Sequence, residues 1–243
     1  MSTEMSSLRL NKRIEQSAKA VLHNARRLLI DADLLQFDQP PATAYYLALI
    51  AQEECAKAFL LGLVCRQVIP WSSHILRASR DHTCKQLLCV VMEYLNPEQD
   101  EFLERCNAVV LRHEQPRFPA KVADAMNILR HEKIGRWISP SWVWAEDPKY
   151  DEDAQAIANG QFDRRKQDAL YVRLAANGGF IPAAPLTNET VRTEMERTDR
   201  FVNLAENLLR EDPQPGLDYD MVEQAFQLLF ANLPSAGSET AAP

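Results

Sequence analysis

Glycine is scarce in this chain, and several features that define common protein classes are missing. Only 7 of its 243 residues are Gly, against 14 Pro, which predicts helices separated by prolines and disfavours a Gly-rich sheet protein. The five cysteines include no CxxC pair, which disfavours a zinc or disulfide framework. The longest apolar stretch, residues 42–65, contains Glu53, Glu54 and Lys57, so we expect a buried helix and no membrane span.

An excess of positive charge is also missing. The net charge is −7, so the chain has no general attraction for nucleic acid, and an RNA contact would need a local basic cluster. The first ten residues lack the apolar segment of a secretory signal. Hydrophobic residues at 46% and charged residues at 25% are ordinary globular values. We therefore expect a soluble, cytoplasmic globular protein.

Apolar residues recur mainly with the spacing of helices. Residues 10–35 repeat them every three or four positions, which predicts one buried stripe. Residues 42–66 are apolar nearly all round, which places that helix at the centre of a bundle. Further helices are expected at 74–95, 98–112, 120–137, 187–209 and 218–233, with a helix or short strand at 164–172 and a turn at 177–179. The fold class predicted is an all-α, antiparallel helical bundle.

The domain boundaries follow from where this periodicity fails. We expect one helical domain over residues 8–210, in which 98–163 is an insertion made of helices and a Trp- and Pro-rich irregular loop from 139. Residues 211–233 would carry a C-terminal helix, and residues 234–243 a disordered tail.

The most informative motif is Gln-Glu-Glu-Cys-Ala-Lys at residues 52–57, inside the most apolar helix. Because an unpaired buried carboxylate costs several kcal/mol, these charges need partners. The simple interpretation is a Glu53–Lys57 pair four residues apart, with Glu54 answering a cation on a neighbouring helix. The alternative is that one carboxylate positions a functional cation or histidine. A di-iron centre would need Glu-x-x-His, and Ala56 and Lys57 stand there instead, so no metal is expected.

A second cluster brings Arg77, Arg80, His82 and Lys85 together. A histidine among cations suits cleavage of RNA without a metal, since His moves protons and Arg or Lys stabilises charge on a phosphoryl group. The alternative is a solvated basic face, with Asp81 paired to Arg77 or Lys85.

Four segments carry a family resemblance: residues 24–35 (Asn-Ala-Arg-Arg-Leu-Leu-Ile-Asp-Ala-Asp-Leu-Leu), residues 44–61 with their Glu-Glu-x-x-Lys centre, His82-x-x-Lys85, and residues 166–172. Together they resemble the AbiV-type abortive-infection family of the HEPN superfamily. The resemblance implies a helical bundle that acts in bacterial defence against phage, as a homodimer and with no cofactor.

The superfamily's nucleases carry an arginine four to six residues before a histidine and cut RNA as dimers without metal. Arg77 and His82 fit that spacing. The resemblance then makes His82 the general acid or base, Arg77 and Lys85 the phosphate stabilisers, and Glu54 the orienting group, supported by Glu53, Lys57 and Arg80. Residues five apart on a regular helix point about 140° apart, so either the helix is irregular there or a dimer completes the site.

A different class of function stays open. The chain could be a non-catalytic HEPN-like module that binds the translation machinery or senses a phage protein. The acidic net charge favours this alternative, and so does Ala78, which follows the motif arginine where active members often have a polar residue.

Overall fold

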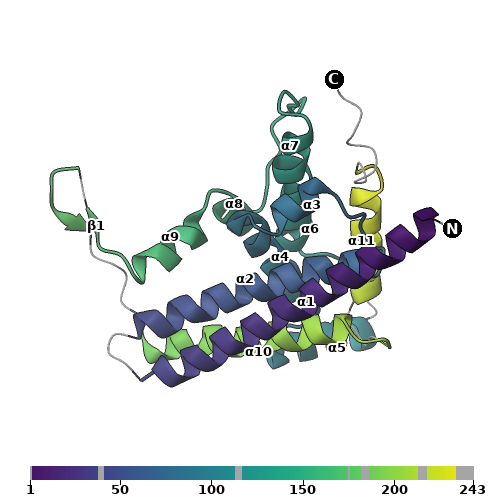
Figure 1. The fold of residues 1–243 in the computed structure, drawn as a ribbon. Helices are drawn as coiled ribbons and strands as arrows, with labels where there is room; N and C mark the ends of the chain where they lie inside the picture. The colour runs from purple at the N-terminus through teal and green to yellow at the C-terminus, as the bar shows by residue number, and fades with distance from the viewer. Residues whose placement is uncertain are drawn as a thin grey trace.

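A computed structural model of the chain describes residues 2–37, 41–112, 117–174, 176–181, 186–212 and 218–233. The described chain is a bundle of helices with one two-residue strand pair, so the predicted all-α class is confirmed (Figure 1). The tail predicted to be disordered, residues 234–243, lies outside the described residues. In the part of the chain that is described, no helix combines the length and apolar character that crossing a membrane requires.

Three long helices form the body of the bundle: α1 (Ser2–Leu35), α2 (Ala42–Cys65) and α10 (Asn188–Leu208). The predicted stripe of α1 is buried, and α2 is buried on nearly all sides, because apolar residues surround it. Helix α2 lies against both α1 and α10 (Figure 1). At Gly62 a Cβ atom would come within 2.6 Å of Leu208 Cδ2, so the glycine permits the close approach of α2 and α10.

The predicted single helix over 74–95 is wrong, because the chain breaks at residues 79–81 into α3 (Ser73–Ala78) and α4 (His82–Leu95). The Asp81 carboxylate accepts a hydrogen bond from Cys84 N at 2.9 Å and caps α4. Asp81 therefore begins a helix, and it forms no ion pair with Arg77 or Lys85 in the described structure. Ser72 caps α3, because its side chain accepts a hydrogen bond from Ile75 N.

The segment 98–163 is more regular than expected. It contains α5 (Gln99–Arg112), α6 (Ala120–Asn127), the π-helix η1 (Ile128–Gly135), α7 (Arg136–Ile138) and α8 (Glu152–Ala158), and α9 (Gln161–Asp168) begins before it ends. The irregular loop predicted from 139 therefore ends at Asp151, whose carboxylate caps α8. Trp142 stacks with His131 of η1 and Trp144 contacts the same ring edge-on, which attaches the loop to the bundle.

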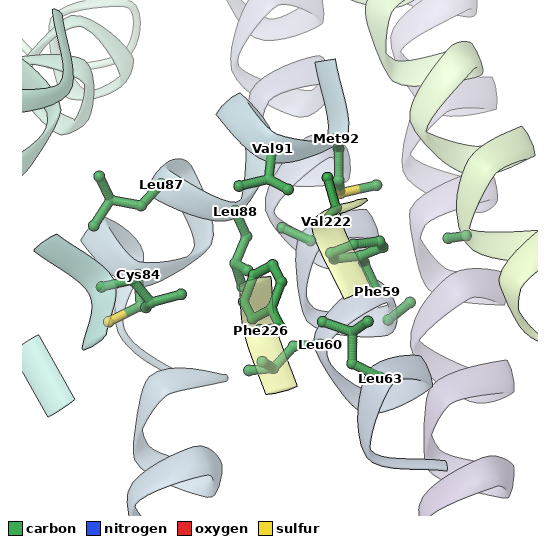
Figure 2. Packing of buried hydrophobic residues seen from close by; sticks show 14 of the residues in the cluster. Phe59, Leu60, Leu63, Cys84, Leu87, Leu88, Val91, Met92, Val222 and Phe226 are labelled. Carbon is green, nitrogen blue, oxygen red and sulfur yellow. The ribbon is translucent and has the colours of Figure 1, made fainter. Parts of the chain in front are cut away.

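After α9 the chain leaves the bundle as a hairpin of β1 (Arg173–Leu174) and β2 (Phe180–Ile181), seen projecting at one end of Figure 1. The predicted turn between them has Gly178 at φ 83°, which suits glycine. Helix α11 (Tyr219–Phe230) returns to the core, where Phe226 and Val222 lie among residues of α2 and α4 (Figure 2).

Candidate active site

The two adjacent glutamates of α2 point in different directions. Consecutive residues of a helix are rotated by about 100°, so Glu53 faces α4 and α9 while Glu54 faces α1. Asn24 of α1 donates to Glu54 Oε2 at 3.1 Å, and Lys57 pairs with Glu54 Oε1 at 3.4 Å. The expected Glu53–Lys57 pair is therefore wrong: Lys57 bonds the nearer carboxylate on its own face, and Glu53 finds cations on other helices.

Glu53 is the centre of a cluster built from three helices. Its side chain is 4% exposed and contacts two lysines: Lys85 Nζ of α4 lies 2.8 Å from Oε2, and Lys166 Nζ of α9 lies 2.8 Å from Oε1. The Gln86 amide nitrogen also reaches Oε1, at 3.4 Å. Both lysines are nearly as buried as Glu53. A carboxylate that accepts several charge-assisted hydrogen bonds is held firmly in one position.

His82, the first residue of α4, completes the cluster. Its Nδ1 lies 2.6 Å from Glu53 Oε2, and its side chain is 53% exposed. Because an ionised carboxylate can only accept, this bond places the ring proton on Nδ1 and leaves the lone pair on Nε2. Within the described residues Nε2 has no hydrogen-bond partner. A buried carboxylate thus orients an exposed imidazole, an arrangement typical of general base catalysis.

The charges of the cluster balance. Asp163 lies one helical turn before Lys166 and accepts from it at 2.8 Å, so two carboxylates face two ammonium groups. Burial raises the pKa of Glu53, but Lys85 and Lys166 oppose this more strongly, and the pKa lies below its ordinary value. Burial lowers the pKa of Lys166, but Asp163 and Glu53 outweigh it, and the pKa lies above its ordinary value. Glu53 and Lys166 are therefore both charged at neutral pH.

Glu53, His82 and Asp163 also bring potential metal ligands within 4.8 Å of one another. The Lys166 ammonium, however, contacts all three, at 2.8 Å from each carboxylate and 3.2 Å from His82 Nδ1. A lysine therefore supplies positive charge at the point where a cation would bind. The donor set does not fit a metal unless Lys166 moves away.

The structure does not bring every predicted site residue to this cluster. The Arg77 guanidinium stacks over Trp137 of α7 at 4.3 Å, and it contacts none of Glu53, His82 or Lys85 in the described chain. Arg80 is exposed in the break between α3 and α4. The helix is irregular between Arg77 and His82, which is one of the two arrangements expected, yet the break directs the arginine away. A role for Arg77 in catalysis stays a prediction that needs another arrangement, such as a second copy of the chain.

Sequence reasoning missed two members of the cluster, Asp163 and Lys166. Both lie on α9, 110 or more positions from Glu53 in the chain. The available signal was the resemblance of residues 166–172 to a family motif, which begins at Lys166. No pattern within a single helix could show that α9 packs its one buried lysine against α2.

Comparison with known proteins places these observations in a family. A family model described as AbiV, of the HEPN type, matches residues 13–209, which is most of the chain and includes segment 98–163. The resemblance predicted from residues 24–35 and the Glu-Glu-x-x-Lys helix is thereby confirmed. No curated protein and no solved structure matches the chain.

Proposed function

Because the chain belongs to the AbiV family of HEPN-type helical proteins, we propose that it is a bacterial abortive-infection protein that cleaves RNA without a metal. The observation that supports catalysis is the 2.6 Å bond between buried Glu53 and exposed His82. In this proposal His82 is the catalytic residue, and Glu53 is the residue that positions it. Glu53 thus takes the orienting role expected of Glu54, since Glu54 contacts Asn24 and Lys57 instead.

The chemistry follows from the orientation of the imidazole. His82 Nε2 takes the proton of a ribose 2′-hydroxyl, the 2′ oxygen bonds to the adjacent phosphorus, and the bond from phosphorus to the 5′ oxygen breaks. The leaving 5′ oxygen takes up a proton, and the products are a 2′,3′-cyclic phosphate and a 5′-hydroxyl. Lys85 and Lys166 keep Glu53 ionised, so that it stabilises the imidazolium formed on His82.

The same chemistry favours a homodimer. Entering and leaving oxygens lie on opposite sides of phosphorus in an in-line displacement, so one imidazole does not reach both at once. A second copy of the chain could supply the proton donor for the 5′ oxygen. We propose a cytoplasmic homodimer as the working form, acting on host or phage RNA.

The test is RNA cleavage in EDTA by the wild type, His82→Ala and the control His23→Ala, an exposed histidine on α1. Thermal melts should show that all three proteins fold, since His82 is half exposed and Glu53 retains both lysines. We expect the wild type and His23→Ala to cut, and His82→Ala to lose at least 100-fold of the rate, within the usual range for general acid–base catalysis of about 10²–10⁴. An RNA with 2′-deoxy substitution should resist cleavage. Equal cleavage by His82→Ala and the wild type would refute the assignment.

One observation favours the alternative, a non-catalytic module that inhibits translation or senses a phage protein. The hairpin and the two residues before it expose apolar side chains, with Tyr171 64%, Val172 75% and Phe180 70% exposed, and such surfaces mark protein contacts. If the wild type protects cells against phage but cuts no RNA, this function replaces the nuclease. The hairpin would then be the first surface to mutate.

A further inference from the structure

A cavity lies directly behind the candidate active site. It has a volume of about 290 Å³, is partly open to solvent, and is lined mainly by α2, α4, α6, α8, α9 and α10. Glu53 and Lys166 form part of its wall, and both also contact His82 Nδ1. The side chains of Glu53 and Lys166 therefore lie between the cavity and the imidazole. A group bound in the cavity would be close to a substrate at His82.

The walls of the cavity are mostly apolar. They include Leu49, Val90, Val122, Ile157, Phe162 and Phe201. Phe162 is an aromatic surface on α9, and the Arg165 guanidinium lies 5.3 Å from its ring. A volume of about 290 Å³ is at the lower end of ligand sites, which span about 300–1,000 Å³. The cavity thus suits one ring system and not an extended chain.

The charged groups deep in the walls already have partners, while Glu101 and Lys121, which are of opposite charge, lie at the solvent side of the cavity. Arg197 of α10 bonds Glu93 and Glu194 at 2.9 and 2.8 Å, and Glu53 bonds Lys166. A charged ligand deep in the cavity, such as a phosphate, would have to break one of these pairs, and for the buried Glu53–Lys166 pair the cost is several kcal/mol. The bound group is therefore expected to be uncharged.

Gln86 of α4 offers a hydrogen-bond acceptor to a ligand in the cavity. Its amide nitrogen faces the Glu53 carboxylate, because that group can only accept. Its Oε1 is buried and has no hydrogen-bond partner among the described residues, and Gln86 lines the cavity. A buried acceptor without a donor is costly, so a ligand that brings an N–H group would satisfy it.

An uncharged, flat ring with N–H donors, bound beside a histidine proposed to act on RNA, is a nucleobase. We propose that this cavity binds a base of the RNA, unstacked and turned inward, next to the phosphate that reacts at His82. This inference rests on the proposed nuclease function for its place in catalysis, but the binding of a base does not depend on cleavage. Unstacking a base costs a few kcal/mol, least in single strands, so the site would select single-stranded RNA.

Binding is tested with defined probes and with variants that fill the cavity. Val90→Phe and Val122→Phe narrow it from α4 and α6, and Val143→Phe is the matched control, since Val143 is 75% exposed in the loop after α7. Calorimetric titration would use adenosine, adenosine 3′-monophosphate and ribose 5-phosphate, with thermal melts to confirm that each variant folds. We expect both adenosine compounds to bind the wild type and Val143→Phe. Ribose 5-phosphate should not bind, and each filling variant that folds should bind adenosine at least ten-fold more weakly.

The outcomes separate this inference from the proposed function. Adenosine binding that Val90→Phe and Val122→Phe abolish, in a protein that cuts no RNA, supports the base site and refutes the nuclease. Cleavage that both filling variants leave unchanged, without adenosine binding, refutes the base site and keeps the nuclease. If no nucleoside binds but the filling variants lose phage protection, the cavity holds a side chain of a partner protein, and the inference is wrong.

Discussion

Glu53 is a charged residue at the centre of an ion-pair cluster, within a helix that otherwise belongs to the hydrophobic core. Its carboxylate lies in the most apolar helix of the chain, 4% exposed, and is the shared partner of Lys85, Lys166 and His82. Because two of these partners are buried cations, Glu53 has both a structural and a positioning role. Any substitution there affects stability and the site together, so the two must be measured separately.

Glu53→Gln is expected to destabilise the fold strongly. It keeps the side-chain volume but leaves the buried charges of Lys85 and Lys166 without their shared partner, which costs about 3–5 kcal/mol. Glu54→Gln is the matched control one position away, where Lys57 is 29% exposed, and its cost should be at most about 1 kcal/mol. Denaturant unfolding of both variants at pH 7 measures the difference. Equal small losses would show that the cluster contributes little.

The same comparison has a defined pH dependence. The pKa of Glu53 is lower in the folded protein than its ordinary value of 4.5. Its ionised form therefore stabilises the fold fully above about pH 4.5, and this stabilisation is lost as the pH falls through the folded pKa. The stability difference between the wild type and Glu53→Gln should shrink as the pH is lowered below 4.5. A difference that stays constant down to pH 2 would contradict the ion-pair explanation.

At the scale of elements, the break between α3 and α4 determines where His82 lies. Asp81 caps α4 by accepting from Cys84 N, which makes His82 the first residue of the helix and directs its ring toward Glu53. The hydrophobic spacing of residues 74–95 continues across the break, so periodicity alone predicts one helix. The cap is visible in the sequence only as an aspartate before a helical run.

Asp81→Ala is expected to cost about 1 kcal/mol of stability, the usual value of an N-cap, and also to slow RNA cleavage because His82 loses its fixed position. Thr187→Ala is the matched control: Thr187 caps α10 through Thr190 N at 3.1 Å and lies outside the cluster. It should lose similar stability with no change in cleavage. Thermal melts and cleavage rates distinguish the two variants, and equal loss of activity in both would mean that stability alone limits the rate.

At the scale of the whole molecule, the family match ends at residue 209 while the core does not. Helix α11 follows that boundary, yet Phe226 and Phe230 are fully buried, and Phe226 lies between Leu60 of α2 and Leu88 of α4 (Figure 2). The C-terminal helix, which was expected after the 8–210 domain, is therefore part of the core that supports α4 and its first residue, His82.

Phe226→Ala should destabilise the protein by about 3–5 kcal/mol, because a large buried side chain is removed and the cavity closes only partly. Leu228→Ala on the same helix is the control, since Leu228 is 80% exposed, and its effect should stay within about 0.5 kcal/mol. Chemical denaturation measures both. A small loss at Phe226 would indicate that α11 docks only loosely.

What the sequence by itself determined is the local order of the molecule. The apolar stripe of residues 10–35 and the all-round apolar character of 42–65 specify the first two long helices, because helix formation and amphipathicity depend on neighbours in the chain. The family motifs within these helices could be recognised in the sequence for the same reason.

Only the tertiary structure decided which charged side chains contact one another. Glu53 pairs with residues 29, 32 and 113 positions away, and its choice of Lys85 and Lys166 over Lys57 depends on how α2, α4 and α9 pack. Such contacts are set by the relative rotation of whole helices, which the sequence of any one helix does not contain.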